Sequence, residues 1–433
     1  MGLQIKKSTL FTVLTNISRV VLALVLVASG FVKAVDPKGT MYKLQEYLSA
    51  FSADVFSNEW LLLFASMLAA AEFLLGLFLL LGVYRKFVAP LSFVAFLFFT
   101  ALTCYIAVFD PIEDCGCFGD ALVLSNEMTF VKNLFLLLLA AVVFLGRRRF
   151  IQNVSSRNRW VVVLYSVFYV VAVETLSLIY VPVIDFRPYK VGADIRELTT
   201  AVPDKYKMVS LYECGDERRY FDEDTVPGDG WEFVEVRSVV DVKGREAVID
   251  DFSILDWSDD YDVADDILAD TGYVCLVVSD FVEDASANRI DRVNDLYDYC
   301  IEKGVQFYMV TASGEEEVEL WQKRTGAEYE LHWADKSLLR DMTRANPGLL
   351  LLKDGVIMGK WAVSDIPEPQ ELFNPVPKGA FLSLLDKVLQ KWYSWLLLLA
   401  IPLVVVAYFD YLAVCVIGRR RDVESDETNE NNK

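Results

Sequence analysis

Two cysteines one residue apart, Cys115 and Cys117, are the residues in this sequence whose type and spacing are best suited to chemistry. They lie in the short polar segment Asp-Cys-Gly-Cys-Phe-Gly, which begins at Asp114, and the chain has seven cysteines in all. A relaxed disulfide joins Cα atoms about 5.5 Å apart, and a Cys-x-Cys pair is too tight for that geometry. A bridge here should therefore be strained and easily reduced, as labile and catalytic disulfides are.

Other interpretations of the pair remain open at this point. The two cysteines could form a structural staple, or simply pack, in a compact glycine-rich turn. We expect no metal site, because no histidine and no second Cys-x-Cys lies nearby to complete one. Cys104, in the apolar run before the loop, is expected to be a packed hydrophobe or an interior partner of the pair.

Length and composition indicate a membrane protein of several domains. A chain of 433 residues predicts two or three domains, and 54% hydrophobic residues with a mean hydropathy of +0.32 are typical of membrane proteins. The net charge of −20 comes from acidic residues concentrated after residue 184. Nucleic acid is excluded as a partner, because phosphate binding needs clustered lysine and arginine.

Six apolar runs are long enough to cross a bilayer, so we expect the lipid bilayer itself to be a partner. The first run resembles a signal peptide, but Phe31 and Val32 continue it past its small residues, and we interpret it as an uncleaved helix. The predicted spans are Ile17–Val32, Trp60–Val83, Phe87–Val108, Thr129–Leu145, Trp160–Val183 and Ser394–Val416.

Basic residues predict the orientation of these spans. By the positive-inside rule, the basic clusters and both termini are cytoplasmic, so the cysteine loop and residues 184–392 face outward, where disulfides persist. By family habit we expect a bacterial inner membrane, with residues 184–392 periplasmic. The N-terminal segment is 1–16, and the acidic, Asn-rich tail 417–433 is expected to be disordered. The clusters are Arg85 with Lys86, Arg147 to Arg149, Arg157 with Arg159, and Arg419 to Arg421.

Several of these residues together resemble the MauE (methylamine utilisation) branch of the DoxX-like membrane family, over residues 15–146. The resemblance implies a four-helix membrane bundle over 17–146 and, because that branch is implicated in forming disulfides in an exported enzyme subunit, a thiol–disulfide role for the cysteine pair with an exported client protein. It is carried by Arg19, Gly30, Lys33, Asp36 and Pro37, by Glu72, by the Cys115-Gly-Cys117-Phe-Gly loop, and by Thr129-Phe-Val-Lys132-Asn133.

Glu72 lies near the middle of the second span, where a charge costs about 2.5 kcal/mol or more. It should face the bundle interior, with Lys33 or Lys132 as partner, although Glu72 is expected to lie deeper than either. Glu72 is either a structural polar contact between helices or a functional acid. In the second case it would act as a proton relay or lie close to a quinone. No motif marks a quinone site, so no cofactor is evident. Glu174 in the fifth span, 160–183, and Asp410 in the sixth, 394–416, raise the same question.

The acidic segment that follows has two parts. Within residues 184–270, apolar and polar positions alternate in Met208–Tyr212 and in Trp231–Val242, with a Pro-Gly-Asp-Gly turn between them, which predicts a β-rich segment. Residues 271–392 alternate strands and helices, end in a hairpin around Lys353-Asp354-Gly355 and a helix at Gly379–Gln390, and resemble a thioredoxin-like fold. Asn346-Pro347 stands where that fold usually carries a cis proline.

The expected redox motif of that fold is absent. A redox thioredoxin carries Cys-x-x-Cys after the first core strand, whereas the segment Asp280–Ser286 has no cysteine. Cys275 and Cys300 are expected to be packed, and Cys214 is the cysteine of this part expected to be exposed, as a candidate partner for the loop pair. His332, the single histidine, is expected to be a packed side chain.

The predicted fold class is thus a polytopic α-helical membrane protein, a four-helix bundle plus two further spans, with an α/β thioredoxin-like extracytoplasmic domain. Two functions follow. In the first, Cys115 and Cys117 cycle between dithiol and disulfide, and the outer domain binds a client protein. In the second, the protein is a non-enzymatic scaffold whose degenerate thioredoxin-like domain binds a partner. The outward Cys-x-Cys slightly favours the first.

Overall fold

The computed structural model describes residues 2–52, 56–112, 114–214, 217–222, 228, 230–249, 251–257, 261–373 and 392–430, with the backbone alone for 2–8, 392 and 413–430. The chain divides into two compact units. One is a helical unit of residues 1–187 and 370–433, and the other, residues 188–369, contains both β-sheets.

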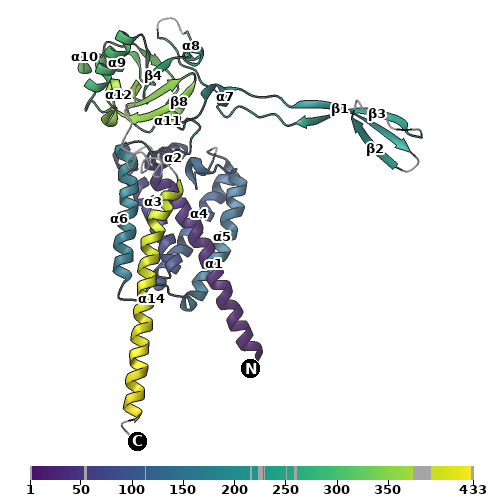
Figure 1. Cartoon of the computed structure of the whole chain (residues 1–433), viewed down its shortest axis with the longest axis vertical. Helices are drawn as coiled ribbons and strands as arrows, with labels where there is room; N and C mark the ends of the chain where they lie inside the picture. Colours follow the sequence, from purple (N-terminus) through teal and green to yellow (C-terminus); the bar gives the residue numbers. More distant parts are fainter. Residues whose placement is uncertain are drawn as a thin grey trace. The chain divides into compact units, whose positions relative to one another are not determined.

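Six helices of the helical unit are long and apolar enough to cross a membrane, counted over the described residues. The prediction of a protein with six spans is confirmed. In Figure 1 the first helix begins, and the last one ends, at the same end of the helical unit. The six helices are α1 (Gly2–Val35), α3 (Asn58–Leu81), α4 (Arg85–Phe109), α5 (Asn126–Gly146), α6 (Arg159–Ile179) and α14 (Trp392–Glu430).

Glycine lets α1 and α3 approach each other closely. A Cβ atom on Gly30 of α1 would lie 2.3 Å from the backbone nitrogen of Phe73, and one on Gly76 of α3 would lie 2.6 Å from that of Val27. Small residues favour such close packing of membrane helices, where dispersion contacts replace the hydrophobic effect as the main attraction. The contact places the Gly30 turn of α1 level with the Glu72 turn of α3.

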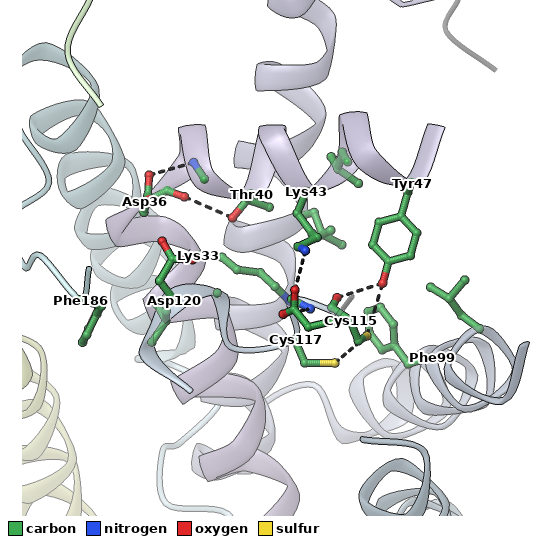
Figure 2. Close-up of a pocket in the computed structure, with 18 of the residues that line it drawn as sticks. Lys33, Asp36, Thr40, Lys43, Tyr47, Phe99, Cys115, Cys117, Asp120 and Phe186 are labelled. Atoms are coloured by element: carbon green, nitrogen blue, oxygen red, sulfur yellow. Dashed lines mark hydrogen bonds and ion pairs between the residues drawn. The ribbon is translucent and has the colours of Figure 1, made fainter. Parts of the chain in front are cut away.

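A short helix, α2 (Pro37–Ala50), follows α1 where the sequence suggested only a loop. Asp36 caps it, accepting a hydrogen bond from Gly39 N at 2.8 Å, and Pro37 occupies its first turn, a combination that favours helix initiation. Figure 2 shows α2 crossing above the cysteine loop, with Lys43 and Tyr47 pointing toward that loop.

Basic residues gather at the other end of the helical unit. Arg19 donates to the carbonyl of Ile151 at 2.6 Å and Arg85 to that of Arg148 at 3.2 Å. The 3-10 turn η2 (Arg147–Arg149) lies in the same region. Asp410 of α14 accepts hydrogen bonds from Ser155 and Asn158. Asp410 therefore anchors the α5–α6 connection. This contact gives a structural role to an acid for which the sequence alone indicated none.

The second unit contains an antiparallel three-stranded sheet in the order β2-β1-β3. Its strands are β1 (Lys205–Cys214), β2 (Glu217–Asp222) and β3 (Glu232–Val242). β1 and β3 contain the two segments whose alternation predicted strands, whereas β2 was missed. β2 is short and has an isolated run of charged residues, Glu217 to Arg219, so it has little apolar alternation to reveal it.

A five-stranded mixed sheet forms the rest of this unit, in the order β6-β5-β4-β7-β8. The strands β4, β5 and β6 run parallel, and β7 and β8 are antiparallel to their neighbours. The Asn346–Pro347 bond is cis. The strands are β4 (Tyr273–Ser279), β5 (Gln306–Thr311), β6 (Leu331–Trp333), β7 (Gly348–Lys353) and β8 (Val356–Ala362).

The helices of this part of the chain are α7 (Ile195–Thr199), α8 (Ala264–Ala269), α9 (Asp291–Lys303), α10 (Glu315–Thr325), α11 (Lys336–Met342) and α12 (Pro369–Phe373), with the 3-10 turn η3 (Val363–Asp365). In the chain, α9, α10 and α11 connect successive strands from β4 to β7, in agreement with the predicted strand–helix alternation, whereas α7 and α8 precede β4 and α12 follows β8. The core of the sheet is an apolar cluster around Leu276, Val278 and Leu350. The predicted helix at 379–390 lies outside the described residues.

The expectation of a disordered tail at residues 417–433 is wrong for residues 417–430. These residues continue α14 to Glu430. A helix already nucleated in a membrane span extends at little cost per residue, and this segment contains arginine and glutamate, which are good helix formers.

Candidate functional site

The cysteine loop is shaped by two glycines between α4 and α5. Gly116 has φ +63° and Gly119 has φ +48°, values that favour glycine because a side chain there is strained. A Cβ atom on Gly116 would also lie 2.7 Å from Cγ of Lys43. The glycine between the cysteines thus turns the chain and lets α2 lie against the loop, while the 3-10 turn η1 (Gly119–Ala121) follows directly.

The two sulfur atoms face each other. Cys115 Sγ and Cys117 Sγ lie 3.1 Å apart, and both thiols are free and half-buried. The Tyr47 hydroxyl donates to the carbonyl of Cys115 at 2.9 Å and lies 3.4 Å from its sulfur, as Figure 2 shows. A disulfide bond is about 2.05 Å long, so the thiols need to approach by only about 1 Å to bridge.

The environment separates the acidities of these two thiols. The hydrogen bond from Cys115 stabilises a thiolate at Cys117, and together with the nearby Lys132 and Lys33 charges it outweighs burial and lowers the pKa of Cys117 to about 6. The same contact and burial raise the pKa of Cys115 well above its usual value. Near neutral pH, Cys117 is therefore the thiolate and Cys115 the thiol, which is the state a reactive pair needs.

Helix α2 clamps the loop from one side through ion pairs. Lys43 pairs with Asp114 and, at 2.7 Å, with Glu46 of its own helix. Burial alone would lower the pKa of Lys43, but these two carboxylates outweigh it and the net shift is upward. Asp114 also accepts a hydrogen bond from Gly116 N at 3.1 Å. The clamp therefore fixes the backbone on which both cysteines are carried.

A buried charged group connects the loop to the bundle interior. Lys33 Nζ lies 2.7 and 2.9 Å from the two carboxylate oxygens of Glu72, and both side chains are at least nine-tenths buried. Ser29 Oγ lies 2.8 Å from Glu72 and 2.7 Å from the carbonyl of Cys117. Lys33 is thus the partner of Glu72, whereas Lys132 lies 4.6 Å over the Phe118 ring.

The register of α1 against α3 brings the Lys33 amine within reach of Glu72. The close approach of Gly30 to Phe73 brings the two helices into register at this level, and Lys33 is one turn from Ser29 on the same face of α1. The sequence could not show this register, because it depends on how α1 and α3 pack.

A cavity of about 600 Å³ lies beside the cysteines, lined mainly by apolar side chains of α2, α4 and neighbouring segments. Cys115 and Cys117 form part of its wall, with Lys33, Lys43 and Tyr47, and Figure 2 shows the labelled residues around this space. A second cavity, of about 40 Å³, is lined by Ser29, Lys33, Glu72, Cys117 and Lys132 among others. It is large enough for a water molecule and has polar partners for one.

The other predicted site residues lie elsewhere. No contact joins Cys104 to Cys115 or Cys117 in the part of the chain that is described, and no group of His, Cys, Asp and Glu there has the arrangement of a metal site. Glu174 is buried in α6 with an oxygen that lacks a hydrogen-bond partner among the described atoms. The α2 residues Lys43 and Tyr47, which sequence reasoning missed, do reach the pair.

In the second unit, Asn346, which precedes the cis proline, binds the end of β4 and the residues that follow it. Asn346 donates to the carbonyl of Phe281 at 2.9 Å and accepts from Ser279 Oγ at 2.6 Å. Cys275 and Cys300 are fully buried, with sulfurs 3.7 Å apart, and Cys214 is exposed.

The single histidine is part of the packed interior of that unit. His332 is 6% exposed, and its Nε2 lies 3.7 Å from Asp256. Burial lowers the pKa of His332, so the ring is neutral near pH 7. Its placement fits the predicted packing role.

The fold and the loop therefore define a polytopic membrane protein with a Cys-x-Cys pair beside a buried ion pair and an apolar cavity. Residues 11–146 match the family model of methylamine utilisation protein MauE, so the four-helix region of this protein is MauE-like, as the sequence resemblance predicted. The match ends within α5. No curated protein and no solved structure matches the chain.

Proposed function

We propose that this protein is a membrane thiol–disulfide oxidoreductase in which Cys115 and Cys117 cycle between dithiol and disulfide and oxidise the thiols of a client protein outside the cytoplasm. The observation that carries the proposal is the facing pair of half-buried thiols, 3.1 Å apart, with unequal acidity. The MauE match of the surrounding helices and the basic end opposite the loop support it.

The acidity difference gives the exchange a direction. A client thiolate attacks Cys115 Sγ of the bridged pair, the bond between the two loop sulfurs breaks, and Cys117 leaves as a thiolate, because the sulfur with the lower pKa leaves faster. The second client thiolate then attacks the client sulfur of this mixed disulfide and releases Cys115. The client is oxidised by two electrons, and the pair is reduced by the same two.

Nearby groups suit this exchange. Lys132 and Lys33 stabilise the departing Cys117 thiolate. The Tyr47 hydrogen bond and the Lys43–Asp114 ion pair hold the loop backbone while the sulfurs move by about 1 Å. Gly116, between the two cysteines in the chain, adds no side chain to the loop.

The test is the redox state of the pair in intact cells. Cells are treated with a membrane-impermeant thiol reagent before and after reduction, and labelled peptides are read by mass. We expect Cys115 and Cys117 to shift reversibly between bridged and free forms. Thiols that stay free under every oxidising condition, or a loop reached only from the cytoplasm, would contradict the proposal.

Single-cysteine variants then test the direction. Cys117→Ser keeps the sulfur that carries the client, so mixed disulfides should accumulate on it, and Cys115→Ser should accumulate fewer. Cys104→Ser is the matched control, because that cysteine has no contact with the pair in the described structure, and it should behave as the unmodified protein. Equal trapping on both single variants would rule out the assigned direction.

A second candidate function, partner binding by the unit of residues 188–369, is favoured by a cavity of about 400 Å³ that includes Trp257, Trp333 and Ser313 in its wall. The two tryptophans are 39% and 37% exposed, and aromatic side chains of this kind are common anchors in interfaces. In this function the unit, proposed to be thioredoxin-like, acts as a scaffold.

Alanine variants separate the two functions. Trp257→Ala with Trp333→Ala should weaken capture of a copurifying partner and leave the redox cycle of the loop intact, while Leu320→Ala, an exposed residue outside this cavity, should change neither. If Cys115→Ser with Cys117→Ser leaves the cellular role of the protein unchanged, the scaffold function is the correct one.

A further inference from the structure

The apolar cavity beside the cysteine pair has no role in exchange with a client. Most of the exposed area of its wall is apolar. The polar groups along it are two thiols, the Tyr47 hydroxyl, the basic side chains of Lys33, Lys43 and Arg187, the Thr40 hydroxyl, and the carboxylates of Asp36, Asp114, Asp120 and Asp185. Its volume of about 600 Å³ falls in the range of ligand pockets, which are mostly apolar with a few convergent polar groups. A site of this composition suits a ligand with an apolar body and a polar, reactive head.

The cavity is reached from the hydrocarbon side of the helical unit. Leu91, Val94 and Phe98 of α4 belong to its wall and are 58%, 57% and 61% exposed. All three lie within a span, Arg85–Phe109, so the surface they share with solvent in an isolated chain faces lipid in a membrane. An occupant that enters past them is membrane-soluble, which excludes a client peptide.

The electron count restricts the occupant further. Each client oxidised leaves the pair as a dithiol, and the pair works again only after it has lost two electrons and two protons. A lipid acyl chain fits the apolar wall but accepts no electrons. The acceptor class that is membrane-soluble, carries a flat ring with polar carbonyl oxygens and takes up two electrons with two protons is the quinones.

We propose that this cavity binds a membrane quinone, with its ring against Cys115 and Cys117 and its tail toward the exposed face of α4. The inference rests on the proposed thiol–disulfide cycle, whose electron acceptor it names. The reaction forms the bond between Cys115 Sγ and Cys117 Sγ and breaks the S–H bond of Cys115, and the second proton is the one that Cys117 released when it became a thiolate. The two electrons and two protons pass to the quinone, which leaves as hydroquinone.

Charged and polar groups beside the cavity match the needs of this step. Lys43 directs two of its three N–H donors to Asp114 and Glu46, and the third can hold a quinone carbonyl. Cys117 lines both this cavity and the small polar one, where Glu72 and Lys33 lie. Cys117 therefore borders both the proposed quinone site and the buried ion pair of Lys33 and Glu72.

The experiment uses the full chain in detergent with decylubiquinone as the probe. Binding is followed by quenching of protein fluorescence, and turnover is followed by hydroquinone formation from the reduced protein together with a count of free thiols. Ala95→Trp fills the cavity, because Ala95 is part of its wall. Leu97→Trp is the matched control, since Leu97 lies two residues away on α4, is 50% exposed and is not part of that wall.

We expect saturable binding to the unmodified protein, weakened about tenfold or more in Ala95→Trp, a loss of about 1.4 kcal/mol, and unchanged in Leu97→Trp. The variant with both Cys115→Ser and Cys117→Ser should form no hydroquinone. Absence of saturable binding, or equal binding by the two tryptophan variants, would overturn the quinone site.

The two proposals fail in different ways. Binding with the expected sensitivity to Ala95→Trp, but with thiols that never bridge, overturns the thiol–disulfide function and leaves the binding site supported. A pair that bridges and exchanges with clients normally in Ala95→Trp, with quinone reduction also unchanged, keeps the oxidoreductase and overturns this cavity as the acceptor site.

Discussion

Cys115 and Cys117 have the same side chain, but their pKa values shift in opposite directions because one thiol donates a hydrogen bond to the other. The donor, Cys115, holds its proton more tightly, and the acceptor, Cys117, loses its proton more easily. Lysine charges add to the difference, because Lys132 lowers the pKa of both thiols whereas Lys33 is a further cause at Cys117. The difference between the two thiols is therefore a property of the folded loop.

Alkylation against pH measures this difference. Because the folded pKa of Cys117 lies at about 6, its rate of alkylation should rise through that pH and level off above it, while Cys115 stays slow at neutral pH. Cys115→Ala removes the S–H donor, so the midpoint for Cys117 should move up by about one unit, equivalent to 1.36 kcal/mol. Peptide mass after timed alkylation gives both rates.

The control for this prediction is Cys104→Ala, which should leave both curves unchanged. Identical titration of the two loop cysteines in the unmodified protein would contradict the assigned asymmetry.

Removing one charge of the Lys33–Glu72 pair should destabilise the protein more than removing both. Lys33→Met leaves the Glu72 charge buried without its partner, which typically costs about 3–5 kcal/mol. The double variant Lys33→Met with Glu72→Leu removes both charges and should recover most of that loss. Thermal unfolding in detergent of the unmodified protein, the two single variants and the double variant completes this double-mutant cycle.

A loss of stability in the double variant equal to the sum of the two single losses would show that the two charges contribute independently, which would contradict the distances in the structure. A matched lysine control is Lys303→Met, which breaks an exposed pair with Glu302 and should cost less than about 1 kcal/mol.

At the scale of elements, the α1–α3 contact carries the network around Glu72. Gly30 meets the backbone of Phe73, and Ser29 and Lys33 lie on the same helix within one turn of it. The distance between these two helices therefore sets the distance between the polar groups of α1 and Glu72.

Gly30→Val should force α1 and α3 apart, because its side chain would meet backbone atoms that have no rotamer by which to move. We expect a loss of stability of about 2 kcal/mol or more, within the range of overpacked cores, and a rise in the accessibility of Cys117. Unfolding temperature and alkylation rate check the two effects. Leu24→Val, on the exposed side of α1, should change neither, and a tolerated Gly30→Val would mean that the helices pack less closely.

The helix α2 acts on the loop in a different way. It is held by its Asp36 cap and by Lys43, and it brings Tyr47 to Cys115. Polar helices of this length are hard to recognise from hydrophobic periodicity, because a single apolar face of three or four residues gives a weak signal.

At the scale of the whole molecule, the basic residues predict the side of the membrane on which each end of the helical unit lies. The residues near η2 form one end, and the cysteine loop lies at the opposite end of α4 and α5. By the positive-inside rule we predict that the loop faces outward, and we predict the same side for the unit of residues 188–369.

An impermeant maleimide tests this orientation. Cys214 is exposed and should be labelled in intact spheroplasts. A cysteine introduced by Arg157→Cys, at an exposed position between α5 and α6, should be labelled only after permeabilisation. Cys275 and Cys300, which are buried, should stay unlabelled under both conditions until the protein is denatured. Labelling of the Arg157→Cys variant in intact spheroplasts would reverse the orientation.

Much of the membrane architecture was predictable because it depends on the chain alone. Long apolar runs must become helices in a bilayer, where every backbone group needs an internal partner, and all six appeared. The hairpin at Lys353–Gly355 and the helix Glu315–Thr325 were predictable for a related reason, since turn residues and helix-starting acids act locally. The Cys-x-Cys spacing likewise marked the reactive loop without any structure.

Other features depend on contacts between residues far apart in the sequence, and only the tertiary structure decided them. Lys33 was one of two possible partners for Glu72 until the Gly30–Phe73 contact set the register of α1 against α3. The acidity of Cys117 depends on where Cys115, Lys132 and Lys33 lie in space, and the cavity beside it is lined jointly by residues of α2, α4 and the loop. Amino-acid types and spacing thus determined which residues could react, whereas packing determined their charge states and what can reach them.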